Sequence, residues 1–266
     1  MDLLGDYGSD DDDDSDTISI TPTTRKRKRS KEQDDTAITP PPITIVPSQS
    51  IKASTFVRST PHVPGNWAGH VFAAVIRLED WRNTLTESLH RFQVYLEKIG
   101  FAGGTVISHL DSNELHMSLA RPFTLQLGSI QPFVQQLEKR LCHLPTITLC
   151  INPCDEKVLV NDDRTRSFWT LPIHANPTLR AIVEEVDAVL QNYNQPAYYN
   201  PPVFHVSVAS VVGDLEALAN RNCQQTKTAK SRGSSSTKSH TRHVNLKQVQ
   251  CSFGNTKCYS INLLQR

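Results

Sequence analysis

Apolar side chains recur at steps of three and four residues in three segments of the chain. This spacing places them on one face of an α-helix, and each segment follows a residue type that caps helices. The predicted helices are 85–99 with a capping box at Thr84 and Glu87, 130–142 with Ser129 as N-cap, and one that begins at Pro177 with Asn176 as N-cap.

Short apolar runs between these helices predict β-strands. They cover 70–76, 146–151, 157–161, 167–173, 244–252 and 257–263. Gly254 and Asn255 lie between the last two runs and are typical of a hairpin turn. The periodic pattern begins at Phe56, so residues 56–266 are predicted to form one folded domain.

The first 55 residues lack this periodicity. They contain the like-charged run Asp10–Asp14 and the consecutive prolines 40–42. Such a segment has too little apolar area to offset the entropy lost on ordering. The whole chain is only 38% apolar, below the ~45–50% typical of globular domains. We therefore expect residues 1–55 to form a disordered tail.

Charge is distributed unevenly along the chain. Residues 1–50 carry a net charge of −5, and residues 51–266 carry +6. The tail nevertheless contains one compact basic cluster, formed by Arg25, Lys26, Arg27, Lys28 and Arg29. A basic cluster in an accessible tail is typical of a nuclear import signal, so we expect nuclear localisation. The alternative is a solvated charge run that contacts RNA weakly.

Residues 221–242 contain six Lys and Arg residues and no acidic residue. Their Ser, Thr and Gly content predicts a mobile basic insert. Such charge attracts polyanions such as RNA, while an inert surface insertion is the alternative.

One short pattern occurs twice. Residues 115–120 read LHMSLA and residues 204–209 read FHVSVA, and no other histidine of the chain has a serine two positions later. The period of two predicts strands with the apolar residues on the core face. His116 and Ser118 then share the opposite face, as do His205 and Ser207. An internal repeat of this kind predicts a duplicated lobe in which the two copies face each other.

Two facing imidazoles, each beside a hydroxyl, are suited to phosphodiester chemistry. One imidazole can take a proton from a nucleophile while the other donates one to the leaving oxygen. The hydroxyls can donate hydrogen bonds to the phosphate oxygens as charge develops. This chemistry requires no cofactor. No carboxylate cluster suggests a metal site, and Cys150, Cys154 and His143 do not have the spacing of common zinc sites.

On the basis of these two motifs, the chain resembles the two-histidine (2H) phosphodiesterase superfamily. It is most similar to the U6 small nuclear RNA 3′-end phosphodiesterases, on four segments of residues 60–266. These are Gly65-Asn66-Trp67-Ala68 with His70-Val71, the two motifs, Tyr199 ahead of Phe204-His205, and Cys251 with Gly254-Asn255.

The resemblance implies an α+β fold of two pseudo-symmetric lobes, each an antiparallel sheet backed by helices, with the active site in the groove between them. It implies a 3′→5′ exoribonuclease that trims the oligouridine end of U6 RNA and leaves a 2′,3′-cyclic phosphate or a 3′-phosphate. His116 and His205 would be the catalytic pair, Ser118 and Ser207 would contact phosphate oxygens, and Tyr199 would stack a base. We take His205 as general base and His116 as general acid, and the reverse assignment stays open.

Two other functions are compatible with the motifs. A 2′,3′-cyclic nucleotide phosphodiesterase in RNA repair would share both motifs but need no extended RNA groove. A non-catalytic RNA-binding splicing factor would have no need for two matched His-x-Ser motifs. We expect a monomer whose partners are RNA and the nuclear import machinery. We expect no membrane association, because no run reaches the ~18–20 apolar residues of a bilayer span.

Overall fold

The structure is a computed structural model that describes residues 43–47, 63–102, 104–111, 113–225, 241–254 and 257–265. These residues belong to one compact unit, Pro40–Arg266. The helices are α1 (Leu78–Lys98), α2 (Leu127–Leu141), α3 (Pro177–Gln191) and α4 (Leu215–Gln225). The strands are β1 (Thr44–Pro47), β2 (Asn66–Arg77), β3 (Thr105–Ser108), β4 (Glu114–Ser118), β5 (Phe123–Gln126), β6 (Ile147–Ile151), β7 (Lys157–Val160), β8 (Arg166–Pro172), β9 (His205–Val212), β10 (Arg242–Leu246), β11 (Gln248–Phe253) and β12 (Lys257–Asn262).

Ten of the described strands form one mixed sheet. Its main path is β1-β3-β9-β4-β2-β11-β12, with β5 paired to β2, β8 paired to β9 and β7 paired to β8. Strands β6 and β10 form a separate two-stranded sheet. Among these strands, only β1 and β3 run parallel to each other. The predicted α+β fold class is confirmed.

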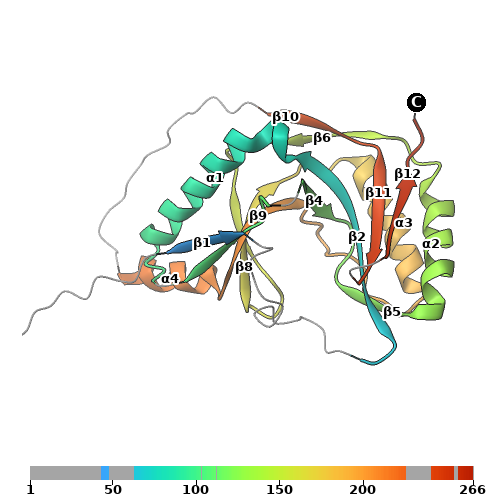
Figure 1. Ribbon diagram of the computed structural model, residues 1–266, viewed down its shortest axis with the longest axis horizontal. Coiled ribbons are helices and arrows are strands. Elements are labelled where there is room, and N and C mark those ends of the chain that lie inside the picture. Colours follow the sequence, from blue (N-terminus) through green and yellow to red (C-terminus); the bar gives the residue numbers. More distant parts are fainter. Residues whose placement is uncertain are drawn as a thin grey trace, which may run out of the picture. The chain divides into compact units, whose positions relative to one another are not determined.

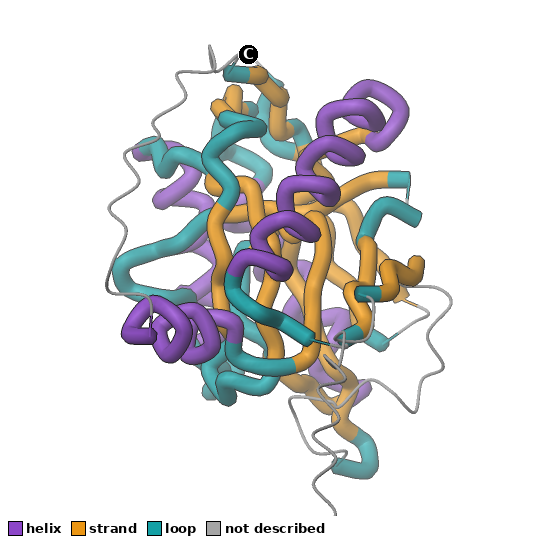
Figure 2. The backbone as a smooth tube through the Cα atoms, turned by 90° about the vertical axis from the view of Figure 1, so that its left-hand side faces the viewer, coloured by secondary structure: helices purple, strands orange, loops and turns teal. Residues whose placement is uncertain are grey.

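The helices flank this sheet on two sides. Helices α1 and α4 lie on one side and α2 and α3 on the other, with the strands between them (Figures 1 and 2). Helix α2 packs against α3, β5 and β12, while α1 packs against β2 and β9. The two halves are joined where β4 pairs with β9, so their sheets are continuous. The two strands that carry the repeated motif therefore meet at the junction of the halves.

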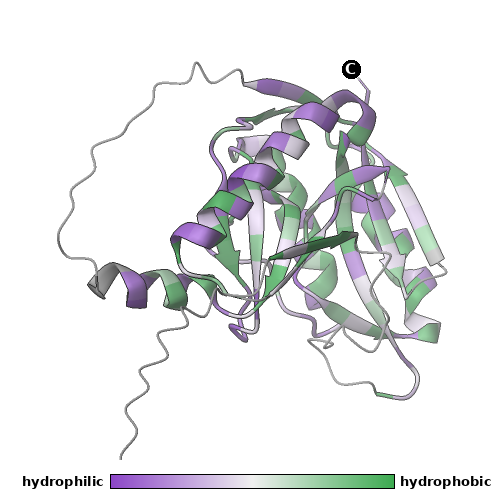
Figure 3. Ribbon diagram, turned by 60° about the vertical axis from the view of Figure 1, so that its left-hand side comes forward, coloured by the Kyte–Doolittle hydropathy of each residue, from purple (hydrophilic) through white to green (hydrophobic). Residues whose placement is uncertain are grey.

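Helix α1 begins at Leu78, earlier than the predicted cap at Thr84. Leu78 and Trp81 are buried in phase with Leu85, so the apolar face extends about two turns further toward the N-terminus. The alternation of hydrophobic and hydrophilic residues along α1 is visible in Figure 3. Thr84 therefore lies inside the helix, where its hydroxyl accepts a hydrogen bond from Arg242. The predicted capping box is wrong.

The predicted cap of the second helix is also wrong, because α2 begins at Leu127 and Ser129 lies in its first turn. The third prediction is confirmed. The side-chain oxygen of Asn176 accepts a hydrogen bond from the backbone N–H of Leu179 at 2.8 Å, and Pro177 occupies the first turn. None of the helices among the described residues is long and apolar enough to cross a membrane.

The single strand predicted over 244–252 is two strands. β10 pairs with β6, whereas β11 pairs with β2 and β12. The reason is a change of phase, because Leu246 and Val249 are both buried but stand three residues apart. A continuous strand would put these two side chains on opposite faces. The β11–β12 pairing confirms the predicted hairpin, in which Gly254 adopts a φ of +56°.

Two predicted boundaries also differ from the structure. Residues 44–47 fall within the tail predicted to be disordered, yet they form β1. This β-branched run pairs with Thr105–Ser108, and Ile45 packs against the core. The predicted insert 221–242 overlaps the end of α4 and the first residue of β10. Residues 1–42 and 48–62, which include the predicted start of the domain at Phe56, and residues 226–240 lie outside the described residues.

The contrast between Asn176 and Ser129 predicts a difference in stability. Replacement of an N-cap asparagine by alanine removes a hydrogen bond to the first helical turn and costs about 1 kcal/mol. Asn176→Ala should therefore lower the free energy of unfolding by about that amount in denaturant titrations. Ser129→Ala is the matched control and should stay within about 0.5 kcal/mol of the unmodified protein. Equal losses in the two variants would contradict this assignment of the caps.

Candidate active site

The two copies of the motif lie on adjacent strands. β4 and β9 run antiparallel, and the central apolar residue of one copy, Met117, pairs with that of the other, Val206. In this register His116 comes opposite Ser207, and Ser118 comes opposite His205. Residues directly opposite in an antiparallel pair have Cβ atoms ~4.5–5.5 Å apart. The structure thus brings all four predicted motif residues together in a crossed arrangement.

The two faces of these strands differ in the predicted way. Met117 and Val206 are fully buried, as are Leu119 and Val208. Their polar neighbours stand on the opposite face, where His116 is exposed and Ser118 and Ser207 are partly exposed. The core thus fixes the backbone from one side while the polar groups remain accessible to a ligand on the other side.

His205 is oriented by a backbone hydrogen bond. Its Nδ1 lies 2.9 Å from the carbonyl oxygen of Val203. A carbonyl oxygen only accepts, so the bond assigns a proton to Nδ1 and leaves the lone pair of the neutral ring on Nε2. Burial lowers the pKa of His205, and the bond to Val203 partly opposes this shift. The resulting neutral imidazole is the form that acts as a general base.

His116 is coupled electrostatically to His205. Partial burial lowers the pKa of His116, and the nearby His205 lowers it further because two imidazolium ions repel each other. The His116 ring also lies edge-on to two rings of β2, with centroid distances of 5.0 Å to His70 and 5.3 Å to Phe72. Simultaneous protonation of both imidazoles is therefore unfavourable. When the pair shares one proton, it provides one acid and one base, which is the state that acid–base catalysis requires.

A third histidine, His70 of β2, belongs to the site and was missed from the sequence. Its Nε2 lies 3.0 Å from the hydroxyl oxygen of Ser118. Burial, and then the neighbouring His116, lower the pKa of His70 to about 3, so the ring is neutral at physiological pH. A neutral His70 that donates from Nε2 leaves the Ser118 hydroxyl hydrogen available for a phosphate oxygen. We therefore regard His70 as a positioning residue for Ser118.

The alternation along β2 explains the location of His70 and could have indicated it. Phe72 pairs with Ser118 and Ala74 pairs with His116, so these β2 residues share the face of the motif side chains. His70 lies on the same face, two positions before Phe72. In the sequence His70 is the first residue of an apolar run, a pattern that predicts burial and does not indicate its polar neighbours.

The two adjacent tyrosines have different environments. Tyr198 is buried and stacks on Phe204 with a centroid distance of 5.5 Å, so it is a core residue. Tyr199 is 39% exposed. The guanidinium of Arg121 lies 4.8 Å from the centroid of its ring, and its hydroxyl lies 3.4 Å from the carboxylate of Asp162. Tyr199 thus remains available as a platform for a base.

Arg121 and Asp162 hold this tyrosine from two different segments. Arg121 lies three residues beyond Ser118, and Asp162 lies in the turn between β7 and β8. Their side chains form an ion pair at 2.6 Å. Tyr199, Arg121 and Asp162 therefore form one cluster that joins the segment after β4 to the β7–β8 hairpin.

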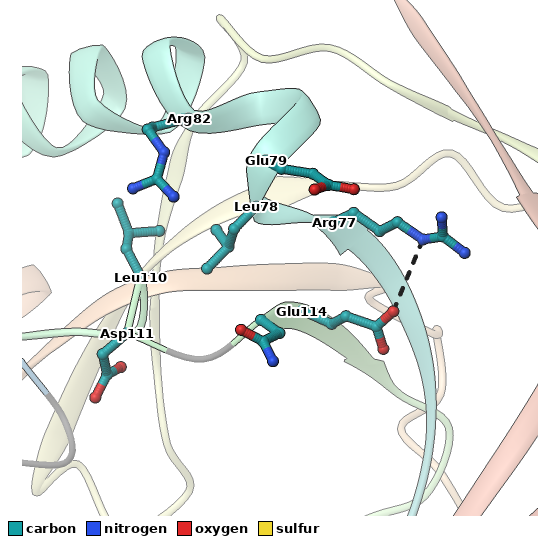
Figure 4. Close-up of a pocket in the computed structure, with 8 residues that line it drawn as sticks. Arg77, Leu78, Glu79, Arg82, Leu110, Asp111 and Glu114 are labelled. Carbon is teal, nitrogen blue, oxygen red and sulfur yellow. Dashed lines mark ion pairs between the residues drawn. The ribbon is translucent and has the colours of Figure 1, made fainter.

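One cavity of the described residues lies away from the motif residues. It has a volume of about 810 Å³ and is lined by the start of α1 and the segment that leads into β4 (Figure 4). Glu79, Asp111 and Glu114 outnumber Arg77 and Arg82 in its lining, and none of the motif residues takes part. Excess carboxylate charge repels a phosphate, so this cavity is a poor site for a nucleotide.

Among the described residues, no group of three or more His, Cys, Asp or Glu side chains has an arrangement that could hold a metal ion. Of the cysteines considered in the sequence, Cys150 contacts His243, with its Sγ 3.4 Å from Nδ1.

The chain matches a family model and a group of curated proteins. The model, named HVSL and described as an uncharacterised conserved protein, matches residues 47–262. The human protein "U6 snRNA phosphodiesterase 1" is 30% identical over 215 residues, which cover 80% of this chain and 76% of the human protein. The Drosophila melanogaster protein of the same name is 32% identical over 178 residues, 64% of this chain and 62% of that protein.

Other relatives are matched over a smaller part of their length. The chain spans 59% of the rat protein and 62% of the mouse protein of that name, at 29% identity to each. Among solved structures, Kluyveromyces marxianus Usb1 superimposes with a TM-score of 0.51 at 12% identity, over 74% of this chain and 98% of that chain. This likeness supports the fold.

The protein combines an α+β fold with two His-x-Ser motifs that meet at the β4–β9 junction. The matches over most of the chain show that it belongs to the family of the U6 snRNA phosphodiesterases.

The buried histidines predict how stability depends on pH. His70, with a pKa of about 3, and His109, lowered to about 4 mainly by burial, stay neutral in the fold at mildly acidic pH. In the unfolded chain both take up protons below about pH 6.5. Because the unfolded state then binds more protons, the free energy of unfolding should fall as the pH decreases from 6.5 toward 4.

His70→Gln removes one such group and keeps a side-chain amide near Ser118. Its free energy of unfolding, measured by denaturant titration from pH 4.5 to 6, should depend on pH less steeply than that of the unmodified protein. The difference in slope should approach about 1.4 kcal/mol per pH unit, the value for one proton. Parallel pH dependences in the two proteins would show that His70 titrates normally in the fold.

Proposed function

We propose that this protein is a 3′→5′ exoribonuclease that shortens the oligouridine 3′ end of U6 small nuclear RNA. The observation that carries the proposal is the opposition of the two His-x-Ser motifs across β4 and β9, in a chain of this family. The arrangement provides one proton acceptor, one proton donor and two hydroxyls around a space for one phosphate.

The proposed reaction is an attack within the RNA itself. The 2′-oxygen of the penultimate nucleotide forms a bond with the adjacent phosphorus, and His205 takes the 2′-hydroxyl proton on Nε2. The bond from phosphorus to the 5′-oxygen of the terminal nucleoside breaks, and His116 donates a proton to that oxygen. Ser118 and Ser207 donate hydrogen bonds to the non-bridging oxygens, where negative charge develops.

This mechanism accounts for an RNA substrate, because DNA lacks the attacking 2′-hydroxyl. It leaves a 2′,3′-cyclic phosphate, which water can open to a 3′-phosphate if the same pair of histidines acts again. The two imidazoles perform both proton transfers, so the reaction as written needs no metal ion. Support for U6 as the RNA comes from the names of the relatives. The Kluyveromyces marxianus structure was also determined with uridine monophosphate.

We extend the proposal to Tyr199, to the quaternary state and to localisation. Tyr199 stacks the base of the 3′-terminal nucleotide, because it is the exposed aromatic ring that precedes His205. The protein acts as a monomer, since one chain supplies both histidines and both serines. The cluster Arg25–Arg29 binds the import machinery and directs the protein to the nucleus, where splicing RNAs are processed.

Loss of either histidine should abolish most of the activity. His116→Ala and His205→Ala should each lower kcat on a uridine-tailed RNA on the order of 10²-fold or more, because general acid or base catalysis contributes ~10²–10⁴. RNA binding should persist, and His90→Ala on the exposed side of α1 is the matched control. Full activity of the His205→Ala protein would refute the mechanism.

The activity should also persist in EDTA. Loss of activity in EDTA, restored by a divalent metal, would refute the claim that the reaction is independent of metal.

Removal of the tail should separate localisation from catalysis. The deletion should end at Thr39, because β1 pairs with β3 from residue 44 onward. The protein lacking residues 1–39 should turn over RNA like the full chain but move from the nucleus to the cytoplasm in cells. Replacement of Arg25–Arg29 by alanines should have the same effect on localisation. Nuclear retention of both proteins would show that another segment carries the import signal.

A further inference from the structure

A second, smaller cavity opens beside His205. It has a volume of about 230 Å³ and lies between the β7–β8 hairpin and the segment that leads into β9. Asp155, Lys157 and His174 contribute polar side chains to its lining, and Leu159, Ile173 and Val203 contribute apolar ones. We infer that this cavity binds the nucleotide on the 5′ side of the scissile phosphate, and that Lys157 binds the next phosphate in the 5′ direction. The inference rests on the proposed function.

The sheet register connects this cavity to the reaction centre. Lys157 of β7 pairs with Thr170 of β8, and Thr170 pairs with Ser207 of β9. The Thr170 hydroxyl donates a hydrogen bond to the carbonyl oxygen of Lys157 at 2.9 Å, which ties the first two strands together. Strands in a sheet lie ~4.8 Å apart, so the backbone of Lys157 is about 10 Å from that of Ser207. Lys157, Thr170 and Ser207 thus form one row that ends at His116 on β4.

The position of His205 decides which nucleotide the cavity takes. In the proposed reaction His205 removes the proton from the 2′-hydroxyl of the penultimate nucleotide. A general base must lie within hydrogen-bond reach of the proton that it abstracts. His205 itself lines the cavity, so the nucleotide with the attacking hydroxyl must sit at or in it.

The two nucleotides that flank the scissile phosphate are assigned to opposite ends of the β7–β8 hairpin. Tyr199 contacts Asp162 in the turn of this hairpin, whereas the small cavity lies at the hairpin's other end, next to Lys157. If the terminal base stacks on Tyr199, the RNA continues toward the cavity in the 5′ direction. A volume below the ~300–1,000 Å³ of typical ligand pockets fits one nucleotide unit and no longer segment.

The positive charge of Lys157 can bind a phosphate at the end of this row that lies farthest from His116. Its side chain is 59% exposed, and its ammonium group lies 3.9 Å from the carboxylate of Asp155. An exposed ion pair at that distance is weak, so a phosphate can compete for the ammonium group. The apolar side chains of Ile173 and Val203 provide surfaces for the uncharged parts of the nucleotide, the base or ribose.

Two dinucleotides test this assignment. UpU contains only the scissile phosphate, while pUpU adds the 5′ phosphate that Lys157 is inferred to bind. The unmodified protein should cleave both, with a KM for pUpU about fivefold lower, the range of a solvent-exposed ion pair. Lys157→Gln should abolish this difference, so that the KM for pUpU equals that for UpU in the variant. Lys157→Glu should raise the KM for pUpU above that for UpU.

Lys139→Gln, in the last turn of α2, is the matched control and should keep the full effect of the 5′ phosphate. The effect in the unmodified protein should also shrink as salt is added. Cleavage of both dinucleotides with equal KM, or an unchanged preference for pUpU in Lys157→Gln, would overturn the inference and leave the proposed function intact. Cleavage of neither dinucleotide by the unmodified protein, together with no trimming of a uridine-tailed RNA, would overturn both.

Discussion

The pairing of Met117 with Val206 determines the geometry of the whole candidate active site. Both side chains are fully buried, so packing in the core fixes the register of β4 against β9 at this residue pair, the central rung of the site. A shift of either strand by one residue would turn its histidine and serine into the core and expose apolar residues. Because each motif is centred on this rung, the two copies are related by an approximate two-fold axis, and each histidine lies across from a serine. The same rung joins the two halves of the sheet.

Burial around this rung also sets the protonation states of the histidines. Burial is the largest cause that lowers the pKa of each of the three rings, His70, His116 and His205. One of the two proton transfers requires a neutral imidazole, and the monoanionic phosphodiester of a bound RNA would favour the proton on the other imidazole. His70 stays neutral and holds Ser118, while the hydrogen bond to Val203 orients His205. In the proposed mechanism, this polar face combines one base, His205, with one acid, His116, that gains its proton when an anion binds.

The motif strands and the third helix could be predicted because their signals are local. The alternation of two around His116 and His205 and the Asn176 cap each involve only a few neighbouring residues, and the structure has all three elements. The cap at Thr84 failed because burial of Leu78 and Trp81 extends α1 past a favourable capping residue. The cap at Ser129 failed although Leu127, where α2 begins, is exposed, and burial does not explain this start. The role of His70 depends on which strand lies beside β4, and the row from Lys157 to Ser207 depends on three strands in register. Such pairings join residues tens of positions apart, and no local pattern encodes them.

The central claim is that paired imidazoles direct the 2′-hydroxyl of RNA against its own 3′ phosphate. The most direct test is mass spectrometry of the ends left on a uridine-tailed RNA, beside the same RNA with one 2′-deoxyuridine at the penultimate position. The account predicts that the all-ribose RNA is shortened with a 2′,3′-cyclic phosphate or 3′-phosphate end in the presence of EDTA, and that the single deoxynucleotide blocks removal of the terminal nucleoside. Removal of that nucleoside from the deoxy-substituted RNA, or a free 3′-hydroxyl on the product, would contradict the account.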